Sequence, residues 1–139
     1  MKDVEKTVGS MIDKQRVAFI GSLDFEGFPN VKAMLQPRKR EGIKTIYLTT
    51  NTSSMRVAQY RKDNRACVYF CDSRFFRGVM LRGTMEVLTD NASKEMIWRE
   101  GDTMYYKEGV TDPDYCVLKF TAISGRFYSK FSSEEFMIE

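Results

Sequence analysis

Residues 45–56 read TIYLTTNTSSMR, and this stretch joins a strand to the start of a helix. The β-forming residues at 45–48 indicate the strand, and Ser53 or Ser54 can cap a helix that carries Val57 and Tyr60 on one side. A helix start presents unpaired backbone N–H groups and a partial positive charge. Both features suit an anion such as phosphate.

The polar run in this stretch is longer than a helix cap requires. Residues 49–54 all carry hydroxyl or amide side chains, whereas one such side chain is enough for a cap. Arg56 follows in the first helical turn, where a guanidinium can hold phosphate oxygens through two parallel hydrogen bonds. The stretch therefore suggests a phosphate site, and a polar loop with a solvent-facing arginine stays open as the alternative. It lacks the glycines of a Walker loop or a dinucleotide fingerprint.

Lys32 and Gly78 are two further candidates for ligand binding. Lys32 and Met34 alternate onto one face of the preceding strand, and neighbouring strands can bring Lys32 near Arg56. An exposed strand lysine is the simpler alternative. Gly78, at the start of a later strand, either lets a flat ligand approach the backbone or marks a β-bulge.

The segments around this corner predict a mainly β fold with flanking helices. A helix is expected over residues 2–14, and Asn91 is expected to cap a second, short helix. The expected strand-like segments are a hairpin over 16–35, then 45–48, 66–71, 76–88, 116–120 and 123–131. The last two could pair with each other, and a short tail follows. Six or seven short strands joined by antiparallel hairpins favour a closed β-barrel over a parallel sheet.

Length and composition set the class of protein. A chain of 139 residues, 42% apolar and 29% charged, is expected to form one globular domain over residues 1–139. No apolar run is long enough for a membrane span and the amino terminus lacks an apolar leader, so we expect a cytoplasmic protein without membrane contact. The odd number of cysteines, three, indicates reduced thiols.

Charge and the absence of histidine narrow the function classes. The net charge of +3 is small, and acidic residues interrupt the basic clusters, so no nucleic-acid partner is expected. The chain has no histidine. This absence removes Ser-His and Cys-His nucleophile pairs, the commonest zinc ligand and histidine ligation of haem. We expect no metal site and no catalytic side chain.

The order of these motifs resembles the pyridoxamine 5'-phosphate oxidase-like FMN-binding split-barrel family, and in particular its general stress protein 26 branch. The resemblance rests on the helix, the hairpin, the Thr-Asn-x-x-Ser-x-Arg corner and the later strand RGVMLRGTMEV, residues 77–87. It extends from about Val4 to Tyr128. It implies a split β-barrel that binds FMN and works as a homodimer with the flavin at the subunit interface.

The resemblance also assigns residues. It implies that Thr50, Ser54 and Arg56 hold the FMN phosphate and that Lys32 stands for a family arginine that also reaches it. The backbone of Ala33, Met34 and Leu35 would lie along the isoalloxazine ring, with Thr49 near its edge. Aromatic residues that could complete the pocket from the partner subunit are Trp98, Phe127 and Tyr128.

Departures from the family pattern argue against two activities known in the family. Gly78 stands where a family glutamine bonds the flavin ring, and the carboxy-terminal Arg-x-His that grips pyridoxal phosphate is missing. Pyridoxamine-phosphate oxidation is therefore not expected. Nitroimidazole reductases of the family use a histidine near the flavin, which this chain lacks.

The resulting hypothesis is an FMN-dependent, NAD(P)H-using reductase of a small molecule with a stress-related role, which exchanges electrons between a donor and an acceptor. One alternative is a flavin-binding or flavin-storing protein without turnover. Another is a relative that binds haem or a deazaflavin in the same barrel.

Overall fold

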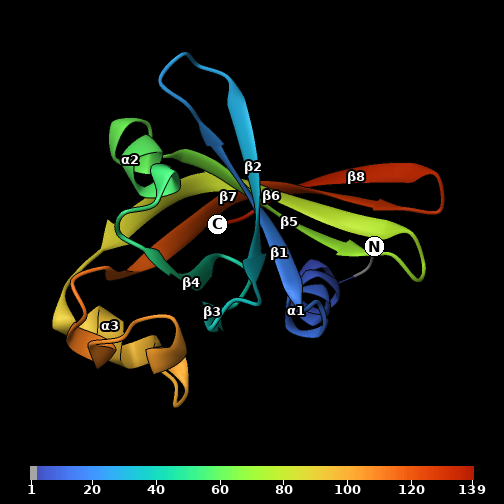
Figure 1. Ribbon diagram of the computed structural model, residues 1–139. Helices are drawn as coiled ribbons and strands as arrows, with labels where there is room; N and C mark the ends of the chain where they lie inside the picture. Colours follow the sequence, from blue (N-terminus) through green and yellow to red (C-terminus); the bar gives the residue numbers. More distant parts are fainter. Residues whose placement is uncertain (1–2) are drawn as a thin grey trace.

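The computed structural model describes residues 3–139, which form one antiparallel sheet and the helices around it (Figure 1). The α-helices are α1 (Val4–Lys14), α2 (Met55–Lys62) and α3 (Asn91–Ile97), and two 3-10 turns, η1 (Asp102–Met104) and η2 (Gly109–Thr111), follow α3. The strands are β1 (Val17–Leu23), β2 (Pro29–Leu35), β3 (Lys39–Glu41), β4 (Thr45–Asn51), β5 (Arg65–Asp72), β6 (Arg77–Leu88), β7 (Tyr115–Ser129) and β8 (Ser132–Met137).

The strands are hydrogen-bonded in the order β2-β1-β5-β6-β7-β4-β3, and β8 pairs with β7 beside this path. Within the described residues the two end strands, β2 and β3, do not pair, so the sheet is curled but open. The predicted class, a mainly β split barrel with flanking helices, is confirmed. The described part of the chain has eight strands instead of six or seven, and the closure of the sheet is not observed.

The carboxy-terminal region differs from the prediction. The two segments expected to pair with each other form a single strand, β7, of 15 residues, and the expected tail is its partner β8. The turn between β7 and β8 places Lys130 and Phe131 at φ values of 50° and 65°. Glycine is the usual residue in this left-handed region, so a turn without glycine left no mark in the sequence.

The helices begin at side-chain caps. Asp3 caps α1 by accepting from the backbone nitrogen of Lys6 at 3.1 Å; the predicted helix started at residue 2, which lies outside the described residues. The cap of α3 is Asp90, which accepts from the nitrogen of Ser93, and the prediction of Asn91 as the cap was wrong by one position.

Two apolar clusters stabilise the fold. The larger one lies inside the curled sheet, where Val8, Met11 and Ile12 of α1 pack against buried residues of β1, β5, β6 and β7. The smaller one consists of Tyr47, Ile97, Tyr106, Tyr115 and Val117, on the other face of β4. No described helix is long and apolar enough to cross a membrane.

Candidate phosphate-binding site

The corner between β4 and α2 brings Thr50 and Arg56 together. Thr50 lies on the same face of β4 as the core residues Ile46 and Leu48 and is only 4% exposed. Arg56 lies in the first turn of α2 and donates from a terminal nitrogen to the Thr50 hydroxyl at 3.2 Å. Of the two serines expected as caps, Ser54 caps the helix, by accepting from the nitrogen of Val57 at 3.4 Å.

The Arg56 guanidinium has an unused donor. Its Nε is buried and has no hydrogen-bond partner among the described residues. An unpaired buried donor usually costs about 1–3 kcal/mol, so such a group calls for a ligand or another partner. Helix geometry also leaves the N–H groups at the start of α2 without intrahelical acceptors, and of these the Val57 nitrogen donates to Ser54. The donor set therefore fits an anion with several oxygens.

Asp114 orders the turn that leads into α2. Its carboxylate accepts from the Ser53 nitrogen at 2.8 Å and from the Asn51 amide at 3.0 Å, and its carbonyl accepts from the Thr52 nitrogen at 2.8 Å. These donors hold the pKa of Asp114 below its ordinary value, with Ser53 as the largest cause. Asp114 therefore fixes the polar run in one conformation, a role that the sequence analysis missed.

Cys116 closes the corner from β7. Its thiol donates to the carbonyl oxygen of Thr50, with 3.7 Å between sulfur and oxygen. Burial raises the pKa of this thiol, so it is neutral at physiological pH. The thiol is a packing and hydrogen-bonding group of the corner, and its neutrality does not oppose an anion there.

A series of contacts connects the corner to Lys32. Gln59 lies one helical turn after Arg56, and its side-chain oxygen accepts from the hydroxyl of Ser22 on β1. Ser22 pairs with Asn30 of β2, and Lys32 is the next residue of β2 on the same face of the hairpin. Ser22 and Lys32 are therefore diagonal neighbours, about 7–8 Å apart. Lys32 thus lies on the face of the hairpin to which α2 docks. It is exposed and has no direct contact with Arg56, so its role stays a prediction.

The contacts that connect Lys32 to Arg56 differ from the expected ones. The sequence analysis placed Lys32 near Arg56 through neighbouring strands, but β2 pairs only with β1 and β4 pairs with β3 and β7. The structure connects the two residues through α2 and β1 instead. The expected alternation of Lys32 and Met34 onto one face is confirmed, since they pair with the buried residues Ile20 and Ala18.

The remaining predicted residues lie away from the corner. Ala33, Met34 and Leu35 lie on β2, whose outer edge is unpaired and leaves backbone N–H and C=O groups available. Thr49 follows the opposite face of β4 and forms a hydrogen bond with Tyr106, which offsets part of the rise that burial causes in the pKa of Tyr106. These four residues are not brought into contact with Arg56, and their roles stay predictions.

Gly78 has a packing explanation within one chain. A Cβ at this position would collide with the phenol of Tyr69 on β5, so the glycine makes room for that ring. The register shift of the β6–β7 pair lies between Arg82 and Gly83, so Gly78 does not mark a bulge. Whether a flavin ring also approaches Gly78 stays a prediction.

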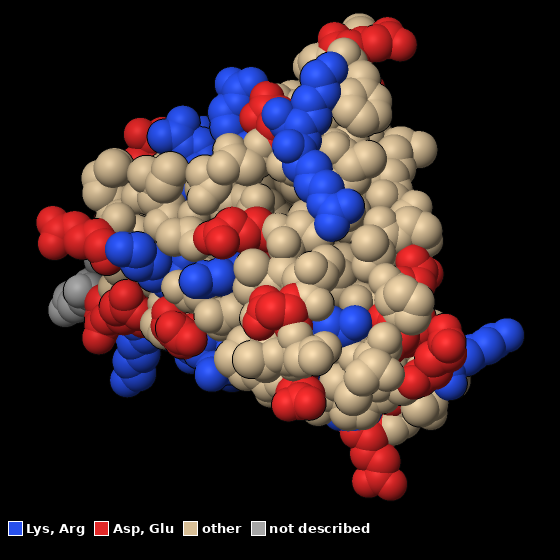
Figure 2. Space-filling model, turned by 90° about the vertical axis from the view of Figure 1, so that its left-hand side faces the viewer, with Lys and Arg blue, Asp and Glu red and all other residues tan. Residues whose placement is uncertain are grey.

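The face of the molecule that carries α2 and α3 shows basic and acidic side chains interspersed (Figure 2). Acidic side chains lie among the basic ones over most of this face, and a short run of basic side chains crosses its upper part in Figure 2. A surface of mixed charge does not by itself select a nucleic-acid backbone, which requires several convergent cations.

The curled, open sheet and its flanking helices have the architecture of a split barrel. The chain belongs to the pyridoxamine 5'-phosphate oxidase-like family, whose model, described as "Pyridoxamine 5'-phosphate oxidase", matches residues 4–129. Members of this family typically bind a flavin and are commonly dimeric. The resemblance stated from the sequence is confirmed.

Among solved structures, the chain is similar to a protein from Clostridium acetobutylicum related to general stress protein 26 of Bacillus subtilis. The identity is 40% and the TM-score 0.88, over 96% of this chain and 93% of that one. General Stress Protein 26 from Bacillus anthracis has 14% identity and a TM-score of 0.79, over 97% and 98% of the chains. A nimC/nimA family protein from Clostridium acetobutylicum has 18% identity and a TM-score of 0.76, over 96% and 92%. The last two show the fold alone. None of the curated proteins compared with the chain matches it.

Proposed function

We propose that this chain is an FMN-binding flavoprotein that acts in the cytoplasm as an NAD(P)H-dependent reductase of a small molecule, with a stress-related role. It works as a homodimer, and each chain forms a single domain over residues 1–139. The observation that carries the proposal is the buried, unpartnered Nε of Arg56 in the first turn of α2, beside the Thr50 hydroxyl.

The residues of the corner suit a phosphate monoester with two negative charges. Arg56 would hold it through Nε and a terminal nitrogen, and Thr50 and Ser54 would donate from their hydroxyls. The Ser54 oxygen already accepts from the Val57 nitrogen, which leaves its proton free for an anion. Lys32 would add a second positive charge from the hairpin face on which α2 docks.

The redox chemistry would come from the bound flavin, which can transfer a hydride or single electrons to a second substrate. The protein's part is to bind, orient and exclude water. The free edge of β2 offers backbone donors and acceptors over residues 33–35 for the edge of a flat ring. No general acid or base is required from the chain.

The outer face of the hairpin supports the dimer. Val31 is 74% exposed and Leu35 58%, and the pairing register adds Val17 opposite Leu35 and Phe19 opposite Tyr69. An apolar surface of this kind on a soluble chain marks an interaction site. A second copy of the chain is the occupant that the family's common dimeric state suggests.

Arg56 is the residue to test. Arg56→Ala should weaken FMN binding by roughly 1–3 kcal/mol, because it removes a charge-assisted pair. Arg56→Lys keeps the charge and should recover most of the affinity, and Arg61→Ala, on the exposed side of the same helix, is the matched control. Titration of the apoproteins with FMN, followed by flavin fluorescence, measures the change. Unchanged affinity in Arg56→Ala would remove the corner from the site.

Absorption spectra of the protein as purified separate the cofactors, because flavin, deazaflavin and haem absorb differently in the visible region. Anaerobic addition of NADH or NADPH then separates a reductase from a flavin-storing protein. Rapid bleaching of the bound FMN supports turnover, and a stable oxidised spectrum supports storage. Size-exclusion chromatography of the same sample reports the oligomeric state.

A further inference from the structure

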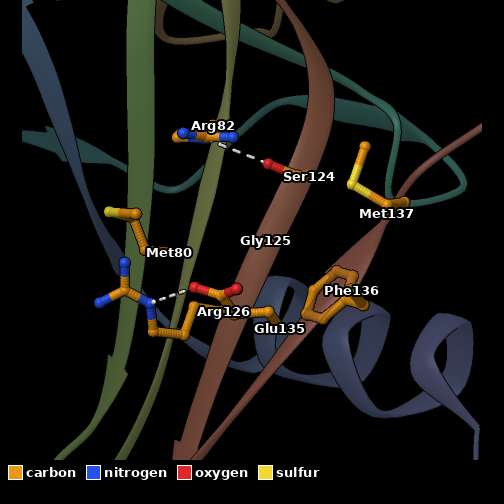
Figure 3. A pocket seen from close by; sticks show the side chains of 8 residues that line it. All are labelled: Met80, Arg82, Ser124, Gly125, Arg126, Glu135, Phe136 and Met137. Atoms are coloured by element: carbon orange, nitrogen blue, oxygen red, sulfur yellow. Dashed lines mark hydrogen bonds and ion pairs between the residues drawn. The ribbon is translucent and has the colours of Figure 1, made fainter.

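A groove lies on the outer face of the sheet where β6, β7 and β8 run side by side (Figure 3). Its volume is about 410 Å³, within the range of small-molecule sites. Strand alternation and the pairing register place six of its lining side chains on this outer face: Met80, Arg82, Ser124, Arg126, Glu135 and Met137.

Two arginines of this groove lie close enough to grip one anion. Arg82 pairs with Ser124 and Met80 with Arg126, so the two arginines are diagonal neighbours about 7–8 Å apart. Figure 3 shows the Met80 side chain between them. That distance separates the backbone positions, and arginine side chains that start this close together are long enough to turn toward different oxygens of one phosphate group.

The arginines are only weakly neutralised. Arg82 donates from Nε to the Ser124 hydroxyl at 3.2 Å, which orients its guanidinium, and it forms no ion pair within the described residues. Arg126 has one carboxylate partner, Glu135, at 3.6 Å between Nε and Oε1, and both side chains are largely exposed. Such an exposed pair contributes little to stability and can be replaced by a stronger anion.

We propose that this groove binds the phosphate monoester group of a small organic ligand, held by Arg82 and Arg126 and by the Ser124 proton. The thioethers of Met80 and Met137 would contact the apolar part of that ligand. Nothing in the Arg56 corner is used by this site, so one chain offers two separate phosphate sites.

The position of the groove on β6 indicates which kind of ligand it binds. Gly78, Met80 and Arg82 alternate along the same face of β6, so Arg82 lies roughly 13–14 Å from Gly78 along the strand. The resemblance places the flavin ring at Gly78. A ligand of ordinary metabolite length could therefore keep its phosphate on Arg82 while its other end reaches the ring. This assignment of the ligand as the electron donor or acceptor rests on the proposed function, whereas the phosphate site itself does not.

The test uses the full chain saturated with FMN, so that the Arg56 corner is occupied, with ¹³C-methyl methionine labelling. Phenyl phosphate is the minimal probe and phenol its uncharged match. We expect phenyl phosphate to shift the methyl signals of Met80 and Met137 and phenol to shift them at least about 10-fold more weakly. Arg82→Met and Arg126→Met should abolish this difference, Glu135→Gln should increase it, and Arg74→Met, outside the groove, should keep it.

Equal responses to the two probes, or a response that survives both arginine substitutions, would overturn the site. Circular dichroism of each variant shows whether it is folded, and Glu135→Gln, which removes no cation, tests the site if an arginine variant is not. A comparison of NADP⁺ with NAD⁺ identifies the ligand that carries the phosphate. If NADP⁺ shifts the methionine signals and NAD⁺ does not, the phosphate belongs to the electron donor. If phenyl phosphate shifts them and neither nucleotide does, the phosphate belongs to the other substrate. The flavin spectrum of each sample reports separately on the proposed function, since the groove can bind phosphate in a chain that fails to bind FMN.

Discussion

The Asp114 carboxylate accepts a hydrogen bond of 2.8 Å from the backbone nitrogen of Ser53, across 61 positions of the chain. This bond ties the start of β7 to the turn before α2. Asp114 therefore limits how the polar run can be arranged, while Thr50, Ser54 and Arg56 keep donors for an anion.

Asp114→Ala should loosen this turn. We expect FMN affinity to fall by about 3–10-fold and the free energy of unfolding by roughly 0.5–1 kcal/mol, after allowance for solvent screening of an exposed carboxylate. Fluorescence titration and urea unfolding measure the two effects. Asp114→Asn keeps an acceptor for the Ser53 nitrogen and should lie between the wild type and Asp114→Ala. An affinity equal to wild type in both variants would contradict the positioning role.

The ion pair of Arg38 and Asp102 makes stability depend on pH. Arg38 donates twice to Asp102, at 2.7 Å each, and both side chains are less than one-tenth exposed. The Arg38 hydrogen bonds hold the pKa of Asp102 below its ordinary value, and that of Arg38 is raised by the same pair. Because the folded-state pKa of Asp102 is depressed, the stabilisation is present above its unfolded value of about 4 and is lost as the pH falls through the lower folded value.

Asp102→Asn should therefore destabilise the protein by about 3 kcal/mol at pH 7, since it leaves a buried guanidinium without its counter-charge. The difference between variant and wild type should shrink as the pH falls from about 4 through the lower folded-state pKa of Asp102, below which the wild-type carboxylate is also neutral. Urea unfolding of both proteins at several pH values gives the comparison. A difference that stays constant with pH would mean that the charge of Asp102 is not the cause.

Gly78→Ala tests the packing of Tyr69 over β6. The added methyl group would meet the phenol, so the substitution should destabilise the fold by roughly 1–3 kcal/mol. In a Tyr69→Ala background the same substitution should have almost no effect, because the colliding ring is gone. A double-mutant cycle by thermal unfolding measures this coupling. Additive effects would show that another neighbour restricts Gly78.

Ser54→Ala removes the cap of α2 and should lower the free energy of unfolding by about 1 kcal/mol. Met55→Ala, at the exposed first residue of α2, is a matched control, because it leaves the cap and the Asp114 contacts in place. The two variants differ by one position in the same turn, and their stabilities can be compared by urea unfolding. Equal losses in both would contradict the assignment of Ser54 as the cap.

The local parts of the site could be predicted from the sequence. The β4–α2 corner, the Ser54 cap and the proximity of Thr50 to Arg56 depend on residues within seven positions of each other, where strand and helix geometry fix the arrangement. The alternation of Lys32 and Met34 also followed from local geometry.

The remaining features depend on contacts between distant segments. Asp114 lay in a region that showed only turn-forming residues, so its contact with Ser53 had no local mark. The same holds for the groove, because Arg82 and Arg126 come together only through the pairing of β6 with β7. The strand β8 was missed since its residues 132–135, SSEE, are polar and exposed, and exposure on both faces removes the alternation that identifies a strand.

The central position of β7 has a consequence for biosynthesis. This strand pairs with β4, β6 and β8, and a ribosome makes it after all the earlier strands. Until it emerges, β4 is paired only with β3 and β6 only with β5, so the strand edges that β7 later joins are open and the apolar core is incomplete. The nascent chain therefore passes through an aggregation-prone stage, in which chaperone binding would protect it until β7 is inserted.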